Sequence, residues 1–156
     1  MTLARAGRDR LLAVALCLIL MIGWSIGQWA TLGRLWLPDT DDMMRLQQVR
    51  DWMGGQRLHD LAQHRLGPSG VPMHWTRVAD LLPAGVILVL RPLLGQPNAD
   101  LAMLVIVPAL LFLAYLLAAL RLYRALEGDG DALAPIVVVT VVLAKLRLPL
   151  VWNVTG

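Results

Sequence analysis

The chain has few charged residues and almost no cysteine. Charged side chains make up 16% of its 156 residues and apolar side chains 58%, whereas an ordinary soluble domain is about 25% charged and about half apolar. This balance indicates a membrane protein. The single cysteine, Cys17, excludes an intramolecular disulfide, and its place inside an apolar run indicates a small residue that fills a packed interior.

Three further absences narrow the function. The 14 lysine and arginine residues are spread along the chain and form no basic tract, which argues against nucleic acid as a partner. No spacing of histidines suggests a zinc site. No internal repeat is present, and this counts against a transporter fragment, although polar residues in short, proline-broken apolar segments can mark transporter substrate sites.

The first long apolar segment runs from Leu11 to about Leu32 and carries no charge. It is long enough to cross a bilayer, because about 20 apolar residues span a hydrocarbon core of about 30 Å. Arginines at positions 5, 8 and 10 precede it, so the positive-inside rule predicts a cytoplasmic N-terminus. A cleaved signal peptide is the rival interpretation, but the run is long and no small-x-small cleavage site follows it. We expect a retained anchor in a bacterial-type inner (plasma) membrane.

Two further spans are expected. Leu101 to Leu120 is closed by Arg121 and Arg124, which lie in the cytoplasm if this helix returns inward. Leu133 to about Val151 would run outward again. This third segment is interrupted by two charges, which are costly inside a membrane: Lys145 and Arg147.

Residues 33 to about 99 would then form one long external loop. It includes an apolar segment, Leu81 to Leu94, that is short for a span and broken by prolines, which indicates a re-entrant or interfacial helix; whether it crosses the membrane stays open. The predicted fold is an all-α, multi-pass integral membrane protein with about three transmembrane helices. Its parts are residues 1–32 with the first span, the loop 33–99 with amphipathic or interfacial helices, and residues 100–156 with two further spans and a truncated end.

Three aspartates open this loop: Asp39, Asp41 and Asp42. Carboxylates near a bilayer surface are natural ligands for a hard divalent cation. Alternatively they cap the following helix, and the two roles can coexist. Apolar residues then recur at helical spacing from Met43 to Met53, ahead of two glycines, which predicts an amphipathic helix. Its apolar stripe suits the membrane surface and packing against other helices of the protein equally well.

A turn rich in glycine and proline, Gly67 to Pro72, follows this helix. His74, Trp75 and Arg77 come directly after it. Trp75 and Arg77 could stack on a sugar or bind a phosphate, and His74 could assist them. Structural hydrogen bonding by the histidine and interfacial anchoring by the other two explain the same residues as well.

In this order the features resemble those of C-type, polyprenol-dependent membrane glycosyltransferases, and among them the catalytic subunit of oligosaccharyltransferase. That family has an N-in first helix and an outer loop that opens with an Asp-Pro-Tyr-Tyr-x-Leu-Arg type motif. Asp41-Asp-Met-Met-Arg-Leu46 occupies that place here. Two later segments also look similar to the family's turn and the stretch after it: Leu66-Gly-Pro-Ser-Gly-Val-Pro-Met-His-Trp75 and Val78-Ala-Asp-Leu-Leu-Pro83.

The resemblance implies a Mg²⁺ or Mn²⁺ ion that binds the phosphate of a lipid-linked sugar donor and stabilises the leaving group. By motif position the family's metal aspartate falls on Asp41, with Asp39 as a second carboxylate and Asp42 beside them. Arg45, His74, Trp75 and Arg77 are then candidates for contacts with the donor phosphate or sugar.

The chain departs from the family in two respects. Met43-Met44 replaces the tyrosine pair, and the second acidic motif that follows the family's third helix does not appear before Gly156. We therefore expect the N-terminal membrane portion of such a glycosyltransferase, incomplete and inactive unless a C-terminal portion or a partner subunit completes the site. The alternative is a small non-enzymatic membrane protein or subunit that packs through its helices.

Overall fold

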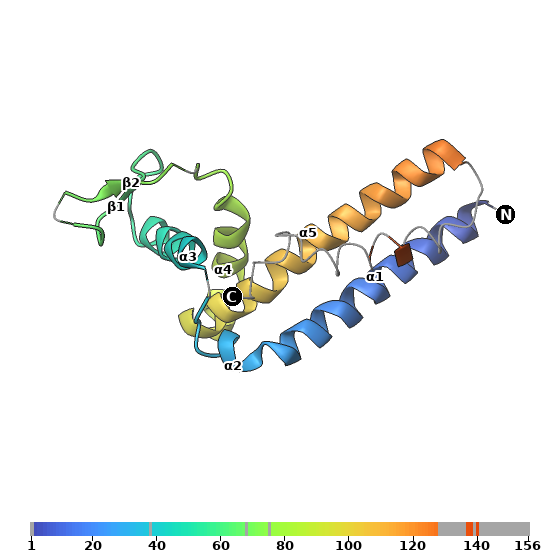
Figure 1. The fold of residues 1–156 in the computed structure, drawn as a ribbon, viewed down its shortest axis with the longest axis horizontal. Coiled ribbons are helices and arrows are strands. Elements are labelled where there is room, and N and C mark those ends of the chain that lie inside the picture. Colours follow the sequence, from blue (N-terminus) through green and yellow to red (C-terminus); the bar gives the residue numbers. More distant parts are fainter. Residues whose placement is uncertain are drawn as a thin grey trace. The chain divides into compact units, whose positions relative to one another are not determined.

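The computed structural model describes residues 2–37, 39–67, 69–74, 76–127, 137–138 and 140. These residues are mostly helical (Figure 1). The helices are α1 (Thr2–Gly27), α2 (Trp29–Leu32), α3 (Thr40–Met53), α4 (Leu81–Leu94) and α5 (Gln96–Glu127), and two short strands, β1 (Ala62–Gln63) and β2 (Val71–Pro72), lie between α3 and α4. The chain divides into two compact units: α1 belongs with α5 from Pro108 onward, and Thr31 to Val107 lies in the other.

Two of the helices are long and apolar enough to cross a membrane, at Gly7–Gly27 and Gln96–Leu126. The first contains the predicted span from Leu11 as far as Gly27, with the remainder in α2, and the second contains all of the predicted span Leu101 to Leu120. α5 begins at Gln96, five residues before the predicted start of the second span at Leu101. Gly95 allows this abrupt start: it ends α4 with φ 75° and ψ 165°, a backbone region that is essentially restricted to glycine. Most of the third predicted span, including Lys145 and Arg147, lies outside the described residues.

In the first unit, α1 packs against the part of α5 that follows Pro108. Ala13, Cys17 and Met21 recur every four residues along one side of α1 and are buried together with Phe112 and Leu116 of α5. Cys17 is 3% exposed and its Sγ lies 3.5 Å from the carbonyl oxygen of Ala109, so it fills the interior as predicted.

In the second unit, α3 packs against α4. The predicted amphipathic helix is confirmed, and it ends at Met53, one residue before Gly54. Its apolar residues Leu46 and Val49 are 2% and 0% exposed, so the inner part of the stripe contacts the protein. Ile87 of α4 is also fully buried.

The segment between these helices is not purely irregular. β1 and β2 pair antiparallel, with Ala62 opposite Pro72 and Gln63 opposite Val71. The predicted turn is present between them, and Gly67 and Gly70 both adopt positive φ there. The short ladder corrects the all-α prediction. Strands of two residues escaped it because the sequence shows no alternation long enough to indicate a strand.

Candidate functional site

The three aspartates lie at the N-terminus of α3, and one of them caps it. The Asp39 carboxylate accepts a hydrogen bond of 2.9 Å from the Asp41 backbone N–H, while Asp41 and Asp42 occupy the first turn. The predicted helix cap is therefore confirmed. Within the ranges that the structure describes, no group of three or more His, Cys, Asp or Glu side chains is arranged to hold a metal ion. The metal role of these aspartates stays a prediction.

The electrostatics of this turn are unusual at Asp42. Partial burial and the negative charge of Asp39 raise the pKa of the Asp42 carboxyl from 3.8 to about 6, with a further rise from Asp41. The positive charge of Arg45, one turn further along α3, opposes the shift. The site carries more negative charge than its own arginine compensates, and it would gain from an added cation.

A second carboxyl lies in the same unit and was missed by sequence reasoning. Asp80 is fully buried before α4; it accepts a hydrogen bond of 3.1 Å from the Gln48 amide and lies 3.7 Å from Arg77. Burial raises its pKa, and the positive charges of Arg45 and Arg77 and the hydrogen bond from Gln48 oppose part of that rise. Its Oδ1 has no hydrogen-bond partner among the described residues. Its signal in the sequence is weak, since an aspartate before a helix usually indicates a cap.

Arg77 lies in the interior of this unit, where it joins the loop to α3. Its side chain is 4% exposed. The guanidinium donates hydrogen bonds of 2.8 Å to the carbonyl oxygens of Gln48 and Asp60 and to the side chain of Gln56, and it lies 6.0 Å from the centre of the Trp52 ring. This network engages Arg77 with the protein itself. His74 is exposed, and Trp75 lies outside the described residues.

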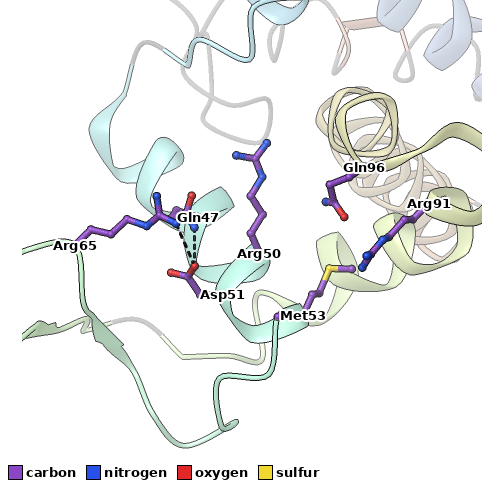
Figure 2. A pocket seen from close by; sticks show the side chains of 8 residues that line it. Gln47, Arg50, Asp51, Met53, Arg65, Arg91 and Gln96 are labelled. Atoms are coloured by element: carbon purple, nitrogen blue, oxygen red, sulfur yellow. Dashed lines mark hydrogen bonds and ion pairs between the residues drawn. The ribbon is translucent and has the colours of Figure 1, made fainter.

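The same unit contains a cavity of about 560 Å³ that is lined by arginines. Sequence reasoning did not find this cavity. They come from three segments: Arg50 from α3, Arg65 from the turn after β1, and Arg91 from α4 (Figure 2). Arg50 donates two hydrogen bonds, of 2.6 and 2.9 Å, to the buried carboxylate of Asp100. Residues so far apart in sequence carry no common spacing that could indicate the cavity.

The sequence and fold match no family model, no curated protein and no solved structure. The functional inference therefore rests on the residues of this chain. The structure brings Asp39, Asp41, Asp42 and Arg45 together on the first turns of α3, and it engages Arg77 in the adjoining buried network.

Proposed function

We propose that this chain is an integral membrane protein and that α3 carries part of the donor site of a glycosyltransferase that uses a polyprenyl-phosphate-linked sugar. The membrane assignment is supported by the two helices of sufficient length and apolarity. In this proposal Leu11 to Leu32 and α5 cross a bacterial-type inner membrane, the N-terminus is cytoplasmic, and α3 lies on the outer side with the donor phosphate.

One observation carries the proposal. Asp39, Asp41 and Asp42 crowd the N-terminus of α3, and burial together with the negative charges of Asp39 and Asp41 raises the pKa of Asp42 to about 6. A divalent cation bound there would relieve this repulsion. Mg²⁺ is commonly held by one or two carboxylates together with substrate phosphates, so Asp41 and Asp42 suffice as the protein's share, while Asp39 caps the helix.

In this proposal each residue of the site has its own role. Asp41 and Asp42 would hold Mg²⁺ or Mn²⁺, which when bound neutralises the charge that develops on the departing phosphate. Arg45 adds positive charge beside them. Arg77 orders the loop behind α3 through its hydrogen bonds to Gln48 and Asp60. A further portion of the chain or a partner subunit would supply the acceptor side.

A Mn²⁺ titration of the detergent-solubilised protein tests the metal site, with paramagnetic relaxation of bound water as the readout. We expect Asp41→Asn and Asp42→Asn each to weaken Mn²⁺ binding, and binding of the wild type to strengthen between pH 5 and 7 as protons leave Asp42. Asp60→Asn is the matched control, since it removes a carboxylate elsewhere in the same unit. Equal relaxation in all four proteins would reject the metal site.

A second function is that of a non-enzymatic subunit that packs through its helices. It is favoured by the exposed apolar face of α1. Leu11, Ile19 and Ile26 there are 66–72% exposed and would contact lipid or another helix. If Mn²⁺ does not bind and cross-linking from these positions captures a neighbouring membrane protein at a defined stoichiometry, this function replaces the enzymatic one.

A further inference from the structure

The arginine cavity has an excess of positive charge. Three arginines and one aspartate line it, which gives a net charge of +2 for the lining (+3 and −1). The lining residues come from α3, from the turn after β1, from the end of α4 and from the first residue of α5. They are Gln47, Arg50, Asp51, Met53, Gly54, Arg65, Arg91 and Gln96.

The three arginines differ in how far the protein already neutralises them. Arg50 is paired with the buried Asp100 at 2.6 Å, and Arg65 lies 3.7 Å from Asp51. The guanidinium of Arg91 makes no hydrogen bond or ion pair with any residue in the described ranges. Figure 2 shows Arg91 and Gln96 on one side of the cavity and Arg65 on the other, with Arg50 between them.

The amides beside them are already committed. Gln47 donates to Asp51 and Gln96 to Asp100, each at 2.6 Å, so both amides are occupied with carboxylates and neither is directed to Arg91. A guanidinium binds the oxygens of a phosphate through paired, charge-assisted hydrogen bonds. Arg91 and Arg65 are thus suited to a phosphate group that enters from solvent.

The surroundings of Arg91 point to the source of that phosphate. On α4, Leu88 and Leu94 lie one turn before and one turn after Arg91, on the same side of the helix, and are 58% and 43% exposed. An arginine between exposed apolar side chains is the arrangement of an interfacial helix, whose apolar residues contact acyl chains while the cation meets the headgroup.

We propose that the cavity between α3 and the end of α4 binds the phosphate of a lipid headgroup, with Arg91 and Arg65 as its ligands and the acyl chains along Leu88 and Leu94. This inference does not rest on the glycosyltransferase proposal, because no residue of the acidic run lines the cavity.

Calorimetric titration of the full chain in a non-ionic detergent tests it with three probes: dioctanoyl phosphatidate, dioctanoylglycerol and inorganic phosphate. We expect phosphatidate to bind at least about tenfold more tightly than either of the others, because it alone offers both the phosphate and the acyl chains. Inorganic phosphate binding as tightly as phosphatidate would overturn the lipid source, and dioctanoylglycerol binding as tightly would overturn the phosphate site.

Variants locate the binding. Arg91→Gln is expected to weaken phosphatidate binding by about tenfold or more, and Arg91→Lys by less, because it keeps the charge and loses the paired hydrogen bonds. Arg57→Gln, which removes an exposed arginine of the same unit outside the cavity, should leave binding unchanged. Equal losses in Arg91→Gln and Arg57→Gln would overturn the site. Unchanged melting temperatures are expected for the Arg91 variants, since this side chain is exposed.

Discussion

Arg124 on α5 donates a hydrogen bond of 2.7 Å to the carboxylate of Asp9 on α1, across 115 positions of the sequence. The Asp9 side chain is 5% exposed, and Arg8 contacts it as well at 3.3 Å. The pair joins the start of one long helix to the end of the other and so fixes their antiparallel register. It also brings Arg8, which precedes the first predicted span, to the same carboxylate as Arg124, which follows the second.

Removing one partner of this pair should destabilise the first unit. Arg124→Gln leaves a buried carboxylate without its main partner, and such a loss typically costs about 3 kcal/mol. Thermal unfolding in detergent, followed by circular dichroism, measures it. Arg121→Gln, an exposed arginine one turn earlier on α5, is the matched control and should change little. In the double variant with Asp9→Asn, the loss should be smaller than the sum of the two single losses; simple additivity would contradict a direct coupling.

Arg77 should be essential to the fold of the second unit. Its buried guanidinium makes three hydrogen bonds of 2.8 Å to α3 and the loop, and Arg77→Leu would leave these acceptors unpaired and remove a positive charge 3.7 Å from Asp80. We expect a loss of about 3–5 kcal/mol and rapid proteolysis between α3 and α4, measured by limited digestion. Arg77→Lys should rescue little, because an ammonium cannot reach three acceptors in fixed directions. Wild-type resistance in Arg77→Leu would show that the network is dispensable.

Substitutions of Asp39 test the helix cap separately from the proposed metal site, because Asp39 caps α3 whereas Asp41 and Asp42 would hold the metal ion. Asp39→Ala removes the acceptor of the Asp41 N–H and should cost about 1 kcal/mol. Asp39→Asn keeps an acceptor oxygen and should retain most of that stability while lowering the local negative charge. The melting temperatures of both variants measure the effect. If Asp39→Asn falls as far as Asp39→Ala, the charge at this position matters more than the hydrogen bond.

Asp42 predicts a pH dependence whose sign follows from its raised pKa. In the folded state Asp42 keeps its proton up to about pH 6, because its pKa is raised to about 6 from the ordinary value of 3.8. This contribution to stability is complete below about pH 4 and is lost as the pH rises to about 6. Asp42→Asn should therefore melt at a higher temperature than the wild type at pH 7.5 and at a similar one at pH 4. Asp41→Asn, at an exposed neighbour, should show a smaller difference between the two pH values. An equal gain at both pH values in Asp42→Asn would contradict the shift.

Much of the helical architecture could be predicted from the sequence, because it depends on local patterns. Apolar length indicated α1 and α5, and the recurrence of Leu46 and Val49 together with the two glycines indicated α3 and its end. The aspartates were expected at the start of that helix, and the Asp39 cap follows from residue type alone. These features depend on neighbours within one or two turns.

The polar interior of the second unit could not be predicted in this way. Asp80 meets Gln48 across 32 positions, and Arg50 meets Asp100 across 50. Such pairs depend on how α3, α4 and the start of α5 pack, and no local pattern in the sequence indicates that packing. Arg77 is a candidate for donor contacts in the sequence because an arginine beside a Gly/Pro turn is expected to be exposed. Its three internal acceptors lie in segments that only the folded structure brings together.

The junction between α4 and α5 offers a last test, at Gly95. Its φ of 75° and ψ of 165° belong to a region that side chains avoid at a cost of about 1–3 kcal/mol. Gly95→Ala has open space for its Cβ, so the loss expected on substitution comes from backbone strain and not from a clash. Gly85→Ala, inside α4 and also without neighbours within 4 Å, should be neutral or stabilising, because alanine favours a helix. Melting temperatures of the two variants make the comparison. Should Gly95→Ala melt with or above Gly85→Ala, α4 and α5 would form a continuous helix in solution, without the left-handed break at Gly95.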